Sequence, residues 1–180
     1  MLYILYFIIP LVFFLLFNGS LVLITRKEFG KCMPLSFILC ALVMYASQAV
    51  FGTFNIGFYS LIFFAFISIP ILIFLFIKKK NLFDDFKKRY FDKGLVAFLV
   101  IYVFFYIFDL RRYFSAWDEF SHWGVMVKEM FRTDSLYSSI ESTLAVHKDY
   151  PPIFQIFELF WTKLCGSYSE PNLLKCIHVF

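Results

Sequence analysis

Two short segments of this chain carry side chains that could take part in chemistry. The first runs Ser-Ala-Trp-Asp-Glu-Phe-Ser-His-Trp-Gly over residues 115–124 and contains Asp118, Glu119 and His122. Because four residues separate Asp118 from His122, the two side chains share one face if the segment is helical. A carboxylate beside an imidazole can accept a proton, or it can hold a divalent cation with a third ligand. A plainer interpretation is a structural ion pair, with Asp118 and Glu119 favoured by the dipole at a helix N-terminus.

The second segment combines both signs of charge with two prolines. It contains His147, Lys148, Asp149 and Tyr150, and the prolines follow directly. Proline favours an extended residue before it and fits the first turn of a helix, so the segment predicts an extended approach to a helix. If the intervening chain folds back, His147 and Asp149 would complete a pocket with the acidic pair. The alternative is a helix entry with Tyr150 as an aromatic anchor.

Arg111 and Arg112 precede the first segment, at the end of an apolar run. A pair of guanidinium groups can clamp the phosphate of a lipid-linked substrate. Equally, long basic side chains at a helix end can simply anchor on lipid headgroups.

The composition restricts the class of protein that carries these segments. Of the 180 residues 61% are hydrophobic, and 28 are Phe. A soluble domain of this length cannot bury so much apolar surface, which excludes a soluble binding module. The net charge is +4. In a membrane protein the placement of charge reports topology, so we expect membrane lipid and no nucleic acid as a partner.

Four long apolar runs predict transmembrane helices, at residues 2–25, 34–54, 57–77 and 95–110. Each approaches the roughly 20 residues that cross about 30 Å of hydrocarbon as a helix. Backbone groups cannot stay unpaired in lipid, which favours helices over strands. Pro10 and Pro70 lie inside two of these runs and predict kinks. We therefore expect an all-α, polytopic membrane bundle.

The connections between these runs predict the orientation of the bundle. Residues 26–31 carry three positive charges and one negative, and residues 78–93 carry seven positive and three negative. The positive-inside rule places both connections in the cytoplasm. Residues 53–56 are uncharged, and residues 111–150 carry five positive and six negative side chains. These two connections are therefore expected outside, in a cell membrane crossed several times.

The external loop and the residues after it contain shorter apolar runs. Over residues 117–131, apolar side chains recur at steps of three and four, which predicts an amphipathic helix on the membrane surface with Ser115 as its N-cap. Asp118, His122 and Glu129 fall on its polar face. Residues 153–165 form a fifth run that includes Gln155, Glu158 and Lys163 and is short for a span. A sixth run, residues 172–180, stops at the last residue, so we expect the chain to be the N-terminal portion of a longer protein.

In their order and predicted side of the membrane, these features resemble the GT-C superfamily of polytopic glycosyltransferases. In that superfamily a transmembrane helix leads to a large external loop with an acidic motif near its start. A Tyr-Pro-Pro-like element often precedes the next membrane helix. Here Asp118-Glu119 matches the acidic motif and Tyr150-Pro151-Pro152 matches the second element. The resemblance covers residues 95–166, and residues 1–94 would form a unit of three additional spans with a basic cytoplasmic loop.

The resemblance implies transfer of a sugar from a polyprenyl-phosphate-linked donor to an acceptor on the outer face. Asp118 would be the base or a metal ligand, with Glu119 and His122 assisting. Arg111, Arg112 and Lys148 would supply positive charge for the departing phosphate, and His147, Asp149 and Tyr150 would bind substrate. Some members use a divalent metal and others do not, so the metal stays open, with Asp118 and His122 as its ligands if one is present.

The alternative is a non-catalytic membrane protein, such as a flippase, a transporter component or a scaffold subunit. A transporter is expected to carry ionisable residues inside its spans. In the four predicted spans, Asp109 lies only at a helix end and Gln48 is uncharged. The sequence therefore argues mildly against ion-coupled transport.

Overall fold

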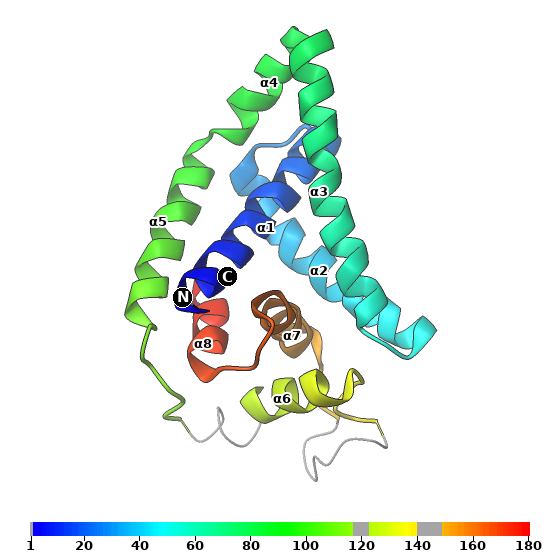
Figure 1. Ribbon diagram of the computed structural model, residues 1–180, viewed down its shortest axis with the longest axis vertical. Coiled ribbons are helices and arrows are strands. Elements are labelled where there is room, and N and C mark those ends of the chain that lie inside the picture. The colour runs from blue at the N-terminus through cyan, green and yellow to red at the C-terminus, as the bar shows by residue number, and fades with distance from the viewer. Residues whose placement is uncertain (1, 117–122, 140–148) are drawn as a thin grey trace.

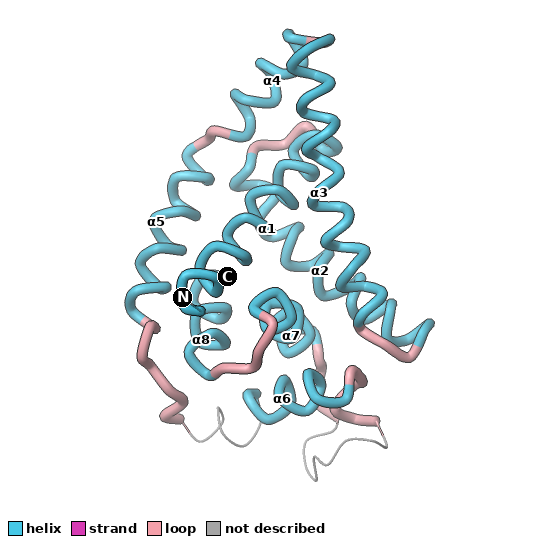
Figure 2. The backbone as a smooth tube through the Cα atoms, viewed as in Figure 1, coloured by secondary structure: helices cyan, strands magenta, loops and turns pink. Residues whose placement is uncertain are grey.

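The described part of the chain folds into helices. A computed structural model describes residues 2–116, 123–139 and 149–180, and these residues form helices and no strand, which confirms the all-α prediction (Figure 2). The helices are α1 (Leu2–Thr25), α2 (Phe29–Phe51), α3 (Asn55–Lys78), α4 (Lys80–Tyr90), α5 (Lys93–Phe108), α6 (Gly124–Thr133), α7 (Ile153–Cys165) and α8 (Glu170–Val179).

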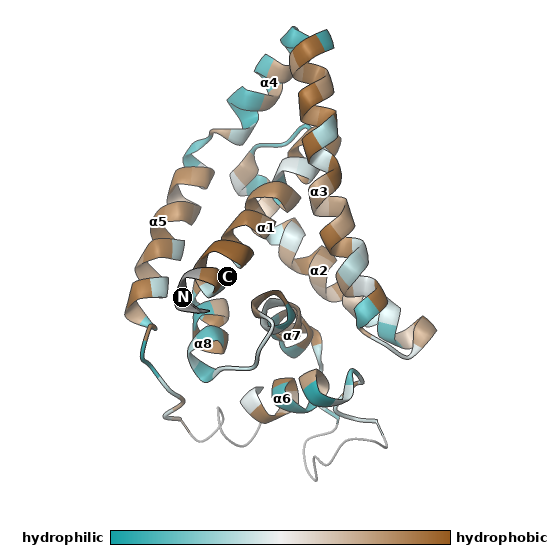
Figure 3. Cartoon of the chain, viewed as in Figure 1, coloured by the Kyte–Doolittle hydropathy of each residue, from teal (hydrophilic) through white to brown (hydrophobic). Residues whose placement is uncertain are grey.

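Three of these helices, α1, α2 and α3, are long and apolar enough to cross a membrane. The pair α4 and α5 passes the same test together but is bent by 49° at the break between them. Three spans, or four if the bent pair counts as one, indicate a multi-pass membrane protein. Figure 3 shows the apolar surface along α1, α3 and α5 and the polar residues gathered on α4. Helices α1 and α3 continue through Pro10 and Pro70.

The limits of α2 and the character of α4 differ from the sequence predictions. Helix α2 begins at Phe29, before Pro34. Phe29 is buried in the core, so the first turn of the helix packs against protein. Residues 80–90, predicted as part of a connection, form the amphipathic helix α4. Its exposed side carries ion pairs from Asp84 to Lys87 and from Asp85 to Arg89, and Phe86 is buried on the other side.

Helix α7 lies across the bundle and forms the centre of the core (Figure 1). Its aromatic side chains pack on α1 and α2, with ring centroids 4.8 Å apart for Phe13 and Phe160 and 4.5 Å apart for Phe37 and Phe157. Almost every residue from Gln155 to Cys165 is buried. A helix of 13 residues can thus be highly apolar without crossing a membrane, because protein surrounds it.

The predicted cytoplasmic connections lie together at one end of the molecule. The backbone N–H of Gly30 donates to Asp92 Oδ2 at 3.2 Å, and the Arg89 guanidinium donates to the carbonyl of Arg26. Gly94 crosses Gly30 so closely that a Cβ on Gly94 would lie 2.3 Å from the Gly30 Cα. The two basic segments are therefore neighbours, as the charge pattern requires.

The other two connections meet at the opposite end of the long axis, where α6 lies (Figure 1). Asn55, at the start of α3, donates through Nδ2 to Asp134 Oδ2 at 2.8 Å. Asp134 caps the C-terminus of α6 with φ of 53°, a left-handed conformation that Asp tolerates better than most residues. The turn at residues 53–56 and the described end of α6 at Asp134 thus share one end.

Candidate functional site

Five of the predicted site residues lie outside the described residues. They are Asp118, Glu119, His122, His147 and Lys148. The described residues that flank them, Ala116 and Trp123 on one side and Ser139 and Asp149 on the other, define the surroundings that can be built from the structure.

The predicted arginine pair follows the C-terminal end of α5 and is exposed. Arg112 Nη1 lies 3.8 Å from Asp109 Oδ1, and its guanidinium carbon lies 5.4 Å from the centre of the Phe108 ring. The Arg112 charge is therefore partly offset by a local carboxylate. Arg111 and Arg112 remain available to an anion that approaches from outside the bundle.

Asp109 is a feature whose role the sequence prediction missed. It is fully buried, and its Oδ2 lies 2.7 Å from His178 Nδ1. The imidazole also stacks on Phe105, with ring centroids 5.0 Å apart. This pair joins the end of α5 to α8. Nothing local marks it, because the partner lies 69 residues along the chain.

Helix α7 begins directly after the two prolines of the second predicted segment, but Asp149 and Tyr150 lie in a turn and not in the predicted extended approach. Pro152 is the N-cap residue, and its carbonyl accepts from the Ile156 N–H at 2.8 Å. The Tyr137 hydroxyl donates to the carbonyl of Tyr150, and the Asp149 and Tyr150 side chains are exposed. A hollow of about 210 Å³ lies between this entry and α2, lined by Ala41, Leu42, Tyr45, Pro151, Pro152, Ile153 and Ile156. Tyr150 is thus held through its backbone at the entry to α7.

Helix α6 corrects part of the prediction for residues 117–131. Residues 117–122, and with them the proposed capping by Ser115, cannot be compared because they lie outside the described residues. Over residues 124–131 the helix is present, and Val127 and Met130 are fully buried. This apolar face packs on α7, so it contacts protein and not a membrane surface. Glu129, predicted on the polar face, is also buried and pairs with Arg132 at 2.8 Å.

An apolar groove opens beside Trp123, the first described residue after the acidic segment. Its volume is about 830 Å³. Its walls come from α2, α7 and α8 in addition to Trp123, and the lining residues are Met33, Pro34, Phe37, Ile38, Trp123, Phe154, Phe157, Glu158, Cys176, Ile177, Val179 and Phe180. The volume lies within the usual range for small-molecule sites, roughly 300–1,000 Å³.

Glu158 is the only ionisable carboxyl group among the described residues that line this groove. Its side chain is 6% exposed, and its Oε2 has no hydrogen-bond partner in the described part of the chain. Burial raises the pKa of Glu158 to about 8, because loss of water penalises the charged form. The group is therefore a neutral carboxylic acid at neutral pH. The sequence offered one signal for it, a glutamate inside an apolar run.

Lys175 is a third buried ionisable group, and sequence reasoning did not select it. Only 2% of this residue is exposed. Its Nζ lies 3.4 Å from Asn172 Oδ1 and 4.3 Å from the centre of the Tyr106 ring. Burial lowers the pKa of Lys175. Three buried ionisable groups, Asp109, Glu158 and Lys175, thus lie in the layer formed by α5, α7 and α8.

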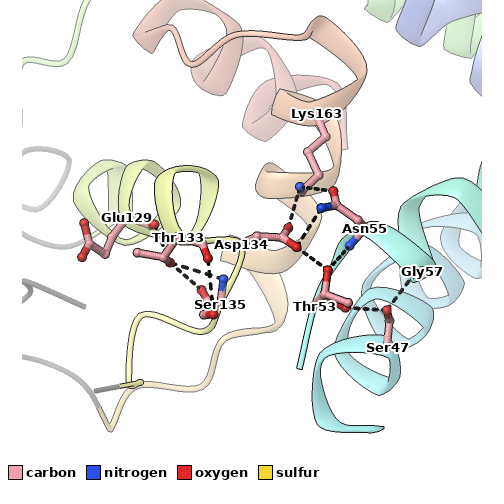
Figure 4. Close-up of polar contacts among 9 residues, drawn as sticks. All are labelled: Ser47, Thr53, Asn55, Gly57, Glu129, Thr133, Asp134, Ser135 and Lys163. Carbon is pink, nitrogen blue, oxygen red and sulfur yellow. Dashed lines mark hydrogen bonds and ion pairs between the residues drawn. The ribbon is translucent and has the colours of Figure 1, made fainter. Parts of the chain in front are cut away.

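A polar cluster fixes the position of α7 and α6 relative to the bundle. Lys163 Nζ lies 2.7 Å from Asp134 Oδ1 and 2.8 Å from Asn55 Oδ1 (Figure 4). The Thr53 hydroxyl also donates to Asp134 Oδ2. We call Thr53, Asn55, Asp134 and Lys163 the Asp134 cluster. Its four residues are hydrogen-bonded to one another, as in a structural contact, and they hold the C-terminal end of α7 in place.

The described residues contain no group of three or more His, Cys, Asp or Glu side chains that could hold a metal ion. Comparison of the chain with protein-family models, with curated proteins and with solved structures finds no match.

Proposed function

We propose that this chain is a membrane glycosyltransferase, or a piece of one, that transfers a sugar from a polyprenyl-phosphate-linked donor to an acceptor on the outer face. The observation that carries the proposal is the position of Trp123. It directly follows the acidic segment in sequence, and it forms one wall of an apolar groove of about 830 Å³. A lipid substrate lying in the groove would contact Trp123, which adjoins in sequence the segment that carries Asp118, Glu119 and His122.

The chemistry of glycosyl transfer fits the residue types at this end of the molecule. A carboxylate must take the proton of the acceptor hydroxyl as the sugar–phosphate bond breaks, and we assign this to Asp118. Positive charge must stabilise the departing phosphate. Arg111 and Arg112 follow α5 and are exposed, and Lys148 belongs to the second segment. A divalent metal, if used, would bind Asp118 and His122 and share the same task.

The test of this assignment is Asp118→Asn, measured with polyprenyl-phosphate hexoses in membranes that contain the protein. Asn keeps the size and the helix-capping ability of Asp but cannot accept the proton. Loss of a general base typically lowers the rate by about 10²–10⁴. Loss of a cap alone would instead cost about 1 kcal/mol of stability. Full transfer activity in a well-folded Asp118→Asn protein would leave Asp118 as a helix-start residue.

We further propose that residues 111–150 are external and residues 78–93 cytoplasmic. The excess of lysine and arginine in α4 and its flanks resists translocation, and the two basic connections lie together at one end. Ser138→Cys should react with an impermeant thiol reagent in intact cells, and Asn81→Cys should not, in a background without the native cysteines. The reverse labelling pattern would invert the orientation and remove the external site.

A second candidate is a transporter or flippase component. The buried Asp109–His178 pair, Glu158 and Lys175 favour it, because ionisable groups inside a membrane bundle mark transport pathways. Purified protein in detergent separates the two functions. A glycosyltransferase forms product without a membrane barrier, whereas a transporter needs sealed vesicles to show any activity.

A further inference from the structure

The groove beside Trp123 contains a group that an apolar groove should not contain. Glu158 Oε2 has no hydrogen-bond partner among the described residues, and the side chain is 6% exposed. A buried polar group without a partner costs roughly 1–3 kcal/mol of stability. Gln155 and Trp161 on α7 also have buried side-chain atoms without a partner among the described residues, but of these three residues only Glu158 lines the groove. An unpaired carboxyl group on a residue that lines a groove indicates that a ligand in the groove supplies the partner.

The walls of the groove indicate that the ligand comes from the lipid phase. Met33, Pro34, Phe37 and Ile38 belong to α2, which is a candidate membrane span. The remaining lining residues, apart from Glu158, are aromatic, aliphatic or cysteine. Such walls are as apolar as lipid tails, so a hydrocarbon chain that moves from the lipid into the groove stays in apolar surroundings. The chain of an amphiphile therefore fits the groove, and one polar atom must fit Glu158.

The charge of the groove distinguishes between possible polar atoms. None of the described lining residues is cationic, so a phosphate deep in the groove would lack a counter-charge. An ammonium group would form an ion pair in an apolar site, where loss of hydration offsets much of the attraction. A hydroxyl group requires neither a counter-charge nor an ion pair. It can donate to one oxygen of a neutral carboxylic acid and accept from the other, which satisfies both partners.

We infer that the groove binds a long-chain lipid alcohol, with its hydroxyl group hydrogen-bonded to Glu158. On the proposed function, this lipid is the acceptor of the sugar, and that part of the inference depends on the proposed function. The binding of the alcohol in the groove does not depend on the proposed function. Helices α2, α7 and α8 hold the chain, Trp123 closes one end, and Glu158 selects the free hydroxyl.

The experiment uses quenching of tryptophan fluorescence by brominated octadecanol in nanodiscs that contain the full chain. Brominated octadecylamine and brominated octadecanoic acid methyl ester have the same chain and different polar ends. A brominated phosphatidylcholine tests whether ordinary bilayer lipid fills the groove. We expect the alcohol to half-saturate at about one-tenth of the ester concentration, because one hydrogen bond to a buried acid contributes about 1.4 kcal/mol. Trp123→Phe should remove most of the saturable quenching.

Variants of Glu158 test the polar contact. Glu158→Gln should keep the preference for the alcohol, because an amide also donates and accepts. Glu158→Leu should abolish the preference and leave the quenching by the ester unchanged. Glu129→Gln is the matched control, since Glu129 is equally buried, at 7% exposed, but pairs with Arg132 away from the groove.

Four results would overturn the inference. These are equal saturation by alcohol and ester, stronger quenching by the amine, stronger quenching by phosphatidylcholine, and saturable quenching that survives in Trp123→Phe. The probe series on the unmodified protein decides the matter even if a Glu158 variant fails to fold. The proposed function fails separately. If Asp118→Asn keeps full transfer activity while the alcohol still binds, the catalytic assignment is lost and the lipid site stands.

Discussion

Asp134 and Glu158 are both acidic residues at the layer formed by α6 and α7, but their surroundings are opposite. The Asp134 carboxylate accepts from Thr53, Asn55 and Lys163, which come from two other parts of the chain. Glu158 lines an apolar groove, and its buried Oε2 has no partner in the described part of the chain. An acid with hydrogen-bond partners, such as Asp134, joins the elements that supply them. A buried acid without a partner, such as Glu158, lowers the stability of the fold, which indicates that it is kept for a function.

The contrast separates Asp134, which stabilises the fold, from Glu158, for which we propose a ligand. Lys163, whose side chain is 11% exposed, would be an uncompensated charge without Asp134. Glu158 avoids that state by remaining neutral, since burial raises its pKa to about 8. Substitution of Asp134 should therefore lower the free energy of unfolding, and an apolar substitution of Glu158 should raise it.

The largest effect is expected for Asp134→Ala. The substitution leaves Lys163 without its carboxylate partner, and it places Ala in the left-handed conformation that Asp134 adopts. Hydrogen bonds to charged groups contribute about 1.5–3 kcal/mol each, so we expect a loss of about 3 kcal/mol in the free energy of unfolding. Denaturation in mixed detergent micelles measures it.

Asp134→Asn is the control for backbone conformation. Asn tolerates the left-handed conformation and keeps one acceptor oxygen. It should lose about half as much stability as Asp134→Ala. If Asp134→Ala is as stable as the unmodified protein, the cluster does not hold α6 and α7 in place.

Glu158→Leu is expected to change stability in the other direction. A leucine removes the unpaired carboxyl group and is compatible with the apolar lining of the groove. Replacing a buried unsatisfied polar group by an apolar one recovers about 1–2 kcal/mol at neutral pH. The same denaturation assay measures the gain. A destabilised Glu158→Leu protein would indicate that Glu158 is a structural residue like Asp134.

The pH dependence of stability provides a test of the Glu158 environment. Its pKa is raised from 4.5 to about 8 by burial. Between these values the unfolded chain has lost the proton and the folded protein retains it, so unfolding releases a proton. Stability should fall as pH rises through this window and should level off above about pH 8.

Glu158→Gln should remove that part of the slope, and the difference between the two proteins isolates it. Tyr168 and Cys176 are the titratable groups electrostatically linked to Glu158, and the pKa of each is raised. Both therefore stay neutral throughout the window. Identical slopes for the two proteins would mean that Glu158 is solvated and that the groove is wet.

The sequence predicted the elements that local signals define and missed those that distant contacts define. Helix α7 has the predicted limits because prolines precede it and Gly166, with φ of 73°, ends it. The start of α2 was predicted five residues late, since the burial of Phe29 against α4 and α5 cannot be read locally. The charge spacing of α4, with Asp85 and Arg89 four residues apart, was a helical signal that the prediction left unused.

The site divides in the same way. The start of α7 directly after Pro151 and Pro152 follows from proline geometry and is confirmed. The predicted extended approach is wrong, because Asp149 and Tyr150 lie in a turn. The groove needs four separate segments, and Asp134 needs partners from about 80 positions earlier in the chain. Such contacts are set by tertiary packing and have no periodicity in the sequence. Only the presence of Glu158 in an apolar run indicated in advance that α7 carries more than packing residues.

The smallest effect is expected for Tyr137→Phe, which gives a neutral contact to set beside the two acids. The Tyr137 ring is 1% exposed, and its hydroxyl group donates to the carbonyl of Tyr150 just before the Pro-Pro entry to α7. Phe keeps the ring packing and removes one neutral hydrogen bond, which contributes about 0.5–1.5 kcal/mol. If Tyr137 only stabilises the fold, Tyr137→Phe should lower the unfolding midpoint slightly and leave quenching by brominated octadecanol unchanged. If it also positions α7 at the groove, the half-saturating concentration of the alcohol should rise while that of the methyl ester stays constant. The contrast between Asp134 and Glu158 predicts the first result, because the hydrogen bond of Tyr137 is satisfied within the protein and none of its atoms line the groove.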